Sequence, residues 1–264
     1  MNRELVDQVH HGDCVDLLAA LPDGSAQLII ADPPYNLGPA FGNSHEWRHD
    51  SDWAAWCRTW LEECHRVLRP DGNLFVYGIH HYLCYLQVAL YEMGLVYRRQ
   101  IIWHYENGFS RTTTTLANHY EPLLWFAEDA KSYYRTIREP YKSTERLKHP
   151  ITKGGRVWTP HPDGRLAGDV WKFPTLAGRR FRDEKVDHPT QKPLALTDRI
   201  VQHFSEEGAL VVVPFAGSGT ECVSAATNGR HYWGAEVNAA YAELARQRVS
   251  EAVAVVTSPS RPAC

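Results

Sequence analysis

The sequence of 264 residues predicts an α/β fold in which a doubly wound, mostly parallel sheet of about seven strands forms one large domain. Apolar runs of strand length alternate with segments of helical periodicity. Two of these runs, 26–31 and 211–213, lead directly into turns rich in proline or glycine. Because open α/β sheets bind ligands at the carboxyl ends of their strands, both turns are candidate functional sites.

The first turn follows the apolar run 26–31, which is predicted to be a buried strand, and consists of Asp32, Pro33, Pro34 and Tyr35. Two prolines in series can neither continue a ladder nor start a helix interior, so they fix a rigid turn with a free carbonyl. The Asp32 carboxylate and the Pro33 carbonyl can accept both hydrogens of an exocyclic amine, while Tyr35 stacks on the ring that carries it. The alternative is an ordinary turn at the end of a strand.

The segments that follow are predicted to be structural. A helix is expected over 53–61 with Asp52 as its cap, and its three tryptophans share one face, which favours core packing over base stacking. Another helix is expected from about 82 to 93. Strands are predicted at 73–78, 99–103 and 122–126.

The second turn follows the strand 211–213 and runs into a helix from about 220 to 228. Gly217 and Gly219 permit positive φ and let a ligand approach the backbone. The third glycine of the dinucleotide fingerprint is absent, with Cys222 in its place, so a bound pyrophosphate is not favoured.

A short strand at 231–236 ends in Glu236, roughly 20 residues past the glycine turn, where folds of this kind hold a ribose diol. Glu236 is therefore the predicted ribose acceptor. The alternative is an acidic residue at a helix start, beside the predicted cap Asn238.

Together the turn 32–35 and the run Pro-Phe-Ala-Gly-Ser-Gly-Thr at 214–220 resemble the amino-group DNA methyltransferases that use S-adenosylmethionine. The catalytic motif comes first, a variable stretch follows and the cofactor motif comes last, which looks like the circularly permuted beta class. The resemblance covers most of the chain, including 12–14, 66–72 and 188–193. It implies the seven-stranded sheet of S-adenosylmethionine-dependent methyltransferases.

The resemblance also implies a cofactor site for S-adenosyl-L-methionine. Phe215 and the two glycines of the turn would line the methionine and adenosine side, Glu236 would bind the ribose, and Asp13 would meet the adenine amine. A helix opened by residues 191–193 would place its N-terminus against the methionine carboxylate, with Lys192 adding positive charge. One departure is Val213, where the family usually has an acid. The implied cofactor-binding set is Asp13, Gln191, Lys192, Pro214, Phe215, Ala216, Gly217, Ser218, Gly219, Thr220, Glu236 and Asn238.

The implied chemistry is a direct displacement, in which the target nitrogen attacks the sulfonium methyl group. Methylation at ring carbon five of cytosine would need a nucleophilic thiol, and the Pro-Cys pair of that family is absent. Adenine N6 is the favoured target, because an acid followed by Pro-Pro-Tyr-Asn looks more like the adenine enzymes; cytosine N4 stays the alternative. The base would have to be flipped out of the duplex. A non-catalytic DNA-binding protein that retains the fold is the alternative from another class.

The charge is distributed unevenly along the chain. The formal net charge is −3, but residues 131–185 hold fourteen Lys and Arg against six Asp and Glu, a balance of +8. Positive charge interleaved with aromatic residues suits phosphate contact and base-edge reading by loops; a solvated loop is the alternative. The loops 36–50 and 107–121 are expected to lie near DNA and the target base. The predicted DNA-binding residues are Arg111, Lys153, Arg156, Arg179, Arg180 and Arg182.

The expected organisation is a catalytic and cofactor-binding domain of residues 1–127 and 186–256, a basic target-recognition insertion of residues 128–185, and a disordered tail at 257–264. The six cysteines show no metal or disulfide spacing, so no metal site is expected. With neither a signal peptide nor a membrane span in the sequence, a cytoplasmic enzyme is expected. Double-stranded DNA is the expected partner, and the resemblance leaves a homodimer and a cognate restriction enzyme open.

Overall fold

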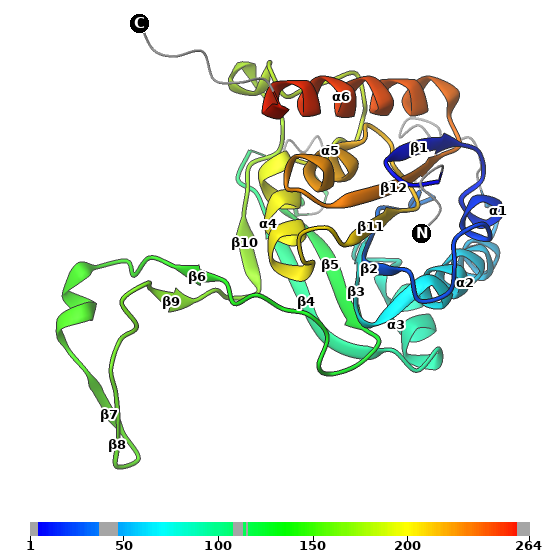
Figure 1. Ribbon diagram of the computed structural model, residues 1–264. Coiled ribbons are helices and arrows are strands. Elements are labelled where there is room, and N and C mark those ends of the chain that lie inside the picture. Colours follow the sequence, from blue (N-terminus) through cyan, green and yellow to red (C-terminus); the bar gives the residue numbers. More distant parts are fainter. Residues whose placement is uncertain (1–4, 37–46, 108–112, 115, 258–264) are drawn as a thin grey trace, which may run out of the picture.

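An eight-stranded sheet forms the centre of the molecule (Figure 1). The structure is a computed structural model that describes residues 5–36, 47–107, 113–114 and 116–257. Neighbouring strands run parallel except β5, which is antiparallel to both of its neighbours. The predicted doubly wound, mostly parallel sheet is therefore confirmed, but it has eight strands where about seven were predicted. The strand order is β1 (Gln8–His11), β12 (His231–Glu236), β11 (Leu210–Val213), β2 (Ala26–Ala31), β3 (Leu68–Tyr77), β5 (Tyr120–Ala127), β4 (Val96–His104) and β10 (Val170–Lys172).

Helices cover both faces of this sheet (Figure 1). One face carries α1 (Cys14–Leu18), α2 (Asp50–Val67) and α3 (Leu83–Glu92), and the other carries α4 (Leu194–Phe204), α5 (Thr220–Thr227) and α6 (Ala239–Thr257). The central strands are buried on both sides, because alternate side chains point to opposite faces. In β2, for example, Ile29 packs with the first set of helices, whereas Leu28 and Ile30 pack with the second.

Helix α2 shows how a tryptophan-rich stretch is used. Trp53 and Trp60 are completely buried, which confirms the prediction of core packing, and Trp56 is half-buried. The predicted cap at Asp52 is wrong, because the helix begins at Asp50 with the extended residue His49 as its N-cap. Asp50 and Asp52 both lie in the first helical turn, where a negative charge interacts favourably with the helix dipole.

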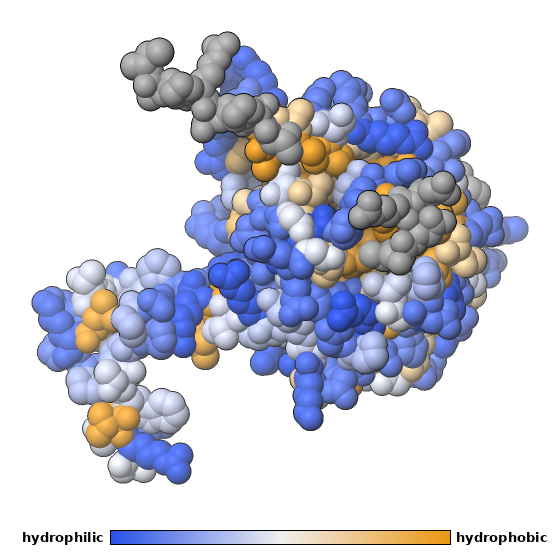
Figure 2. All heavy atoms as spheres, viewed as in Figure 1, coloured by the Kyte–Doolittle hydropathy of each residue, from blue (hydrophilic) through white to orange (hydrophobic). Residues whose placement is uncertain are grey.

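Residues 138–166 form an arm that extends away from the sheet (Figure 1). It contains the ladder between β6 (Arg138–Glu139) and β9 (Arg165–Leu166), a 3-10 helix (Thr144–Lys148) and the hairpin of β7 (Ile151–Lys153) with β8 (Arg156–Trp158). The arm surface is mostly hydrophilic, with isolated apolar spots (Figure 2). Its base is tied to α4, because Glu139 binds Arg199 at 2.9 Å. The expected insertion 128–185 is therefore not wholly outside the sheet, since β10 within it pairs with β4.

Among the helices of the described ranges, none combines the length and apolarity needed to cross a lipid bilayer. In those same ranges, no cluster of three or more His, Cys, Asp or Glu side chains has the arrangement of a metal site.

Candidate active site

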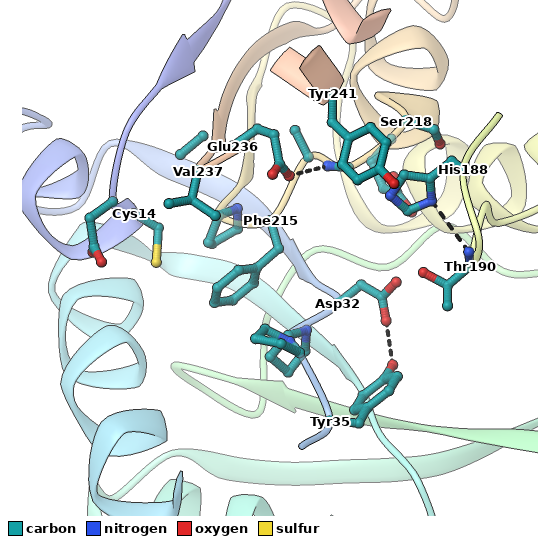
Figure 3. A pocket seen from close by; sticks show the side chains of 18 of the residues that line it. Cys14, Asp32, Tyr35, His188, Thr190, Phe215, Ser218, Glu236, Val237 and Tyr241 are labelled. Carbon is teal, nitrogen blue, oxygen red and sulfur yellow. Dashed lines mark hydrogen bonds between the residues drawn. The ribbon is translucent and has the colours of Figure 1, made fainter. Parts of the chain in front are cut away.

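A cavity of about 350 Å³ opens at the carboxyl ends of β1, β12, β11 and β2, which are consecutive parallel strands. Both predicted turns face it, so the structure brings the candidate catalytic and cofactor residues into one site. Figure 3 shows Phe215 between Glu236 and Asp32. The predicted residues that line the cavity are Asp13, Asp32, Pro33, Pro34, Tyr35, Lys192, Pro214, Phe215, Ala216, Gly217, Ser218 and Glu236. Four predicted cofactor residues do not line it: Gln191, Gly219, Thr220 and Asn238.

The two glycines of the turn have different roles. Gly217 has a φ of +50° and faces the cavity, and a Cβ there would lie 2.9 Å from His188 Nε2. Gly219 has a φ of +78° and is the N-cap of α5. A Cβ at Gly219 would lie 2.7 Å from the Cβ of Ala245, so this glycine permits close packing of α5 against α6 and does not contact a ligand in the cavity.

Glu236 is fixed at the end of β12 by two backbone N–H groups. Its Oε2 accepts from Gly217 N and its Oε1 from Asn238 N, both at 2.8 Å. Burial raises the pKa of Glu236, and these hydrogen bonds oppose that rise. Each carboxylate oxygen keeps a second lone pair, which can accept from a hydroxyl group. Asn238 instead caps the start of α6, because its Oδ1 accepts from Ala240 N at 2.9 Å.

Asp13 occupies the corresponding position after β1. It is the N-cap of α1 and its Oδ1 accepts from Val15 N at 2.8 Å. The glycine before it, Gly12, donates its N–H to the Glu236 carbonyl at 3.0 Å, which brings the two acidic residues to the same side of the cavity.

Asp32 is engaged at both carboxylate oxygens. The Tyr35 hydroxyl donates to Oδ1 (Figure 3), and Lys192 Nζ lies 2.7 Å from Oδ2. The Lys192 side chain is only 4 % exposed, and its Nζ is also 3.3 Å from Glu121 Oε2 and 4.9 Å from the centre of the Tyr77 ring. Lys192 directly precedes Pro193, the N-cap of α4, and its ammonium is directed at Asp32 and Glu121, so it bridges the catalytic turn and β5.

The start of α4 also differs from the prediction. The helix begins at Leu194, and its first N–H donates to Glu184 Oε1 at 2.6 Å, so an internal carboxylate occupies the N-terminus expected to face a ligand. Gln191 braces the preceding loop, because its Oε1 accepts from Val186 N and its Nε2 donates to the Glu184 carbonyl, both at 2.9 Å. The physical reason is the loop 184–191, which folds back over the helix start.

Burial dominates the electrostatics of the cavity floor. It raises the pKa of Glu121, and together with the Asp32 charge it raises the pKa of Glu221 to about 7. Burial lowers the pKa of Lys192, but Asp32 and Glu121 outweigh it, so that pKa lies above its ordinary value. Burial also lowers the pKa of His188 to about 4, which leaves its imidazole neutral at pH 7.

Several cavity residues were not predicted to lie in the site, and one of them, Trp56, was expected to pack in the core. Trp47 and Trp56 line one wall with rings 4.6 Å apart, and the rings of His188 and Tyr241 form another wall at the same separation. The motif 188–193 was a signal for His188, but neither tryptophan is in a motif. The remaining unpredicted lining residues are Gly12, Cys14, Thr190, Glu221, Ala235 and Val237.

The predicted DNA-binding residues fall in two places outside the cavity. Lys153 and Arg156 are paired across the exposed β7–β8 hairpin of the arm. Arg179 and Arg180 lie in a 3-10 helix (Arg179–Phe181) followed by Arg182, and all three side chains are exposed. Arg111 lies outside the described residues.

Comparisons with known proteins identify the family of this chain. The family model N6_N4_Mtase, described as DNA methylase, matches residues 26–247. Type II methyltransferase M1.MboII of Moraxella bovis is 30 % identical over 252 residues, covering 91 % of this chain and 95 % of that protein. DNA adenine methyltransferase YhdJ of Escherichia coli (strain K12) is 32 % identical over 247 residues, covering 92 % and 82 %.

A solved structure shares the fold. TTHA0409 of Thermus thermophilus, complexed with S-adenosyl-L-methionine, has a TM-score of 0.60 and 24 % identity, and the match covers 93 % of this chain and 95 % of that one. Sequence motifs, cavity and relatives lead to one conclusion: this chain belongs to the N6/N4 family of amino-group DNA methyltransferases.

Proposed function

We propose that this protein transfers a methyl group from S-adenosyl-L-methionine to the exocyclic amine of a base in double-stranded DNA, with adenine N6 as the target. The observation that carries the proposal is that the turn 32–35 and the glycine turn after β11 line one cavity. The acidic turn and the relative YhdJ, named as an adenine methyltransferase, favour adenine. The family model covers both N6 and N4 enzymes, so cytosine N4 is the second candidate.

The cavity suits the cofactor. Glu236 offers lone pairs to a ribose diol, and Asp13 can accept from an amine. Because Gly217 has no Cβ, its backbone is open to a ligand, and a Cβ there would collide with His188. The Phe215 ring lies between Glu236 and Asp32 (Figure 3), where it can pack against the adenosine. When bound, the cofactor supplies an electrophilic methyl group on a sulfonium.

The catalytic turn would bind and orient the nucleophile. Asp32 Oδ1 accepts from the Tyr35 hydroxyl and keeps a second lone pair, which can accept from the target amine. The Pro33 carbonyl takes the second hydrogen, which directs the nitrogen lone pair toward the methyl group. Lys192 holds Oδ2 at 2.7 Å and so fixes the carboxylate plane. As the bond between the nitrogen and the methyl carbon formed, the bond between that carbon and the sulfonium sulfur would break. S-adenosylhomocysteine would be the leaving group, and the surplus proton would pass from the nitrogen to Asp32 Oδ1.

DNA would be held by the basic segment. The arm, with Lys153 and Arg156 at its hairpin, would contact the phosphates of the duplex, and its loops would contact base edges. The target base would flip out of the duplex into the cavity. An enzyme whose substrate is cellular DNA would act in the cytoplasm. A homodimer and a cognate restriction enzyme stay predictions of the resemblance.

The test is mass spectrometry of nucleosides from unmethylated DNA incubated with the protein and deuteromethyl-labelled S-adenosylmethionine. Labelled N6-methyladenine is expected, and Asp32→Ala should remove it while DNA binding is retained. Labelled N4-methylcytosine would support the same mechanism with cytosine, in place of adenine, as the target base. If wild type binds DNA and yields neither product, the non-catalytic alternative is the better account.

The basic segment is tested separately by replacing Arg179, Arg180 and Arg182 with alanine. If each contacts a phosphate, the slope of log K against log salt should fall by about 0.9 per residue lost. Fluorescence anisotropy with labelled duplex at several salt concentrations measures this slope. Arg58→Ala, which removes an exposed arginine of α2, is the control for net charge. A slope equal to that of the control would exclude the triplet from the interface.

A further inference from the structure

Glu221 is a buried carboxylate that the proposed reaction leaves unused. It lies in the first turn of α5, is 5 % exposed and lines the cavity. Its Oε1 has no hydrogen-bond partner within the described part of the chain. A buried acceptor that lacks a donor costs folding free energy. Because the Glu221 side chain also lines the cavity, we expect its donor to be supplied by a bound ligand.

The groups around Glu221 carry excess negative charge. Asp32, Glu121 and Glu221 share one close cation, because Lys192 lies at 2.7 Å from Asp32 and 3.3 Å from Glu121 and interacts electrostatically with Glu221. Tyr77 faces the same cluster from β3, and its pKa is raised well above the usual value by burial first and then by Glu221, so its hydroxyl stays neutral.

Two further basic groups lie near the cluster, and one of them, Arg248, interacts electrostatically with Glu221. The Arg248 side chain of α6 donates hydrogen bonds from Nη1 to the Ser218 carbonyl and to Thr220 Oγ1. These bonds fix one side of its guanidinium group against the glycine turn. His188 is neutral at pH 7, because burial lowers its pKa to about 4. The cavity floor therefore suits a ligand that brings both a positive charge and N–H donors.

We propose that Glu221 binds the ammonium group of the methionine part of the cofactor. This inference rests on the proposed function. Glu221 follows the turn of Gly217 and Ser218 on the cofactor side of the cavity, whereas the target amine is neutral and is met by Asp32. The family usually has an acid directly before the Pro-Phe pair, where this chain has the apolar Val213. Glu221 supplies an acidic side chain in the same region of the site.

The experiment is isothermal titration calorimetry of S-adenosylhomocysteine with wild type and Glu221→Gln. A second ligand is the deaminated analogue, which keeps the carboxylate and lacks the ammonium. Glu221→Gln should bind S-adenosylhomocysteine about tenfold to a hundredfold more weakly, as expected for loss of a hydrogen bond to a charged group. Its affinity for the deaminated analogue should equal that of wild type. Glu62→Gln, at an exposed position of α2, is the matched control and should bind both ligands as wild type does.

Equal losses for the two ligands, or no loss for either, would overturn the assignment of Glu221. Absence of any binding by wild type would instead refute the proposed function. A second measurement needs no variant. Around pH 6.5, binding of S-adenosylhomocysteine should release a proton, seen as a dependence of the binding enthalpy on the ionisation enthalpy of the buffer. The deaminated analogue should release none, and equal release by both ligands would also overturn the assignment.

Discussion

Replacing Lys192 with methionine should leave two partly buried carboxylates, those of Asp32 and Glu121, without their cation. The ammonium lies 2.7 Å from Asp32 Oδ2 and 3.3 Å from Glu121 Oε2, which at an effective dielectric constant of about 20 corresponds to attractions of about 6 and about 5 kcal/mol. The loss in stability is smaller, because a stranded carboxylate can take up a proton, at a cost of about 4 kcal/mol at pH 7. We expect Lys192→Met to lower the free energy of unfolding by about 3–5 kcal/mol.

The sign of the pH dependence follows from that proton. In the folded variant, one of the two carboxyl groups holds a proton. In the unfolded variant, the same group releases that proton above the ordinary carboxyl pKa. The folded form therefore binds more protons, and acidification stabilises it. The stability difference from wild type should therefore shrink by about 1.4 kcal/mol for each pH unit between pH 8 and pH 6. Adding Glu121→Gln to the variant should recover part of the loss, because one of the stranded charges is then removed.

Urea denaturation followed by tryptophan fluorescence at pH 6, 7 and 8 measures both effects. The control is Lys172→Met, which removes an exposed lysine that pairs with Glu106 at 2.8 Å and should leave the free energy of unfolding close to that of wild type. A loss for Lys192→Met that is equal at pH 6 and pH 8, or one that Glu121→Gln makes larger, would refute the electrostatic account.

Three further predictions concern the cavity and the packing of α5 beside it. Tyr35→Phe keeps the ring and should leave the methyl-transfer rate within about threefold of wild type. Tyr35→Ala loses base stacking of about 1–3 kcal/mol and should raise KM for DNA. Equal effects of the two variants would exclude stacking by Tyr35. Gly219→Ala should destabilise by about 1–3 kcal/mol in urea denaturation, because its Cβ meets Ala245, and more than Gly94→Ala, which has a similar φ and open space. Affinity for S-adenosylhomocysteine should rise up to about tenfold per pH unit from pH 5.5 toward 7, as Glu221 with its pKa of about 7 ionises, and level off above. A profile that is unchanged in Glu221→Gln would contradict this.

The parts of the site that the sequence predicted are those fixed by local backbone chemistry. The prolines at 33 and 34 end β2 in a rigid turn, and Gly217 adopts a positive φ after β11, so both turns follow from residue type and from the apolar runs before them. Parallel neighbouring strands then bring the two turns to one sheet edge. The general fold and the candidate catalytic turn were therefore predictable.

The parts that the sequence did not predict depend on contacts between distant segments. Glu121 begins an otherwise apolar strand, and nothing near it in the sequence indicates a partner 71 positions away at Lys192. Glu221 resembles an ordinary acid in the first turn of a helix, and only the packing of α5 against its neighbours buries it. Glu184 and the start of α4 are likewise joined by a loop whose path no periodicity describes.

The attachment of the arm has a consequence for how such enzymes can diversify. The two ends of the arm meet at its base, because Arg138 of β6 lies opposite Leu166 of β9 in an antiparallel ladder. Between such fixed and closely spaced points, residues 138–166 can lengthen, shorten or be exchanged without displacing the strands that carry Asp32 and Glu236. Under the proposed function, mutation can thus explore new duplex contacts in one part of the gene while the chemistry encoded in the rest is inherited unchanged.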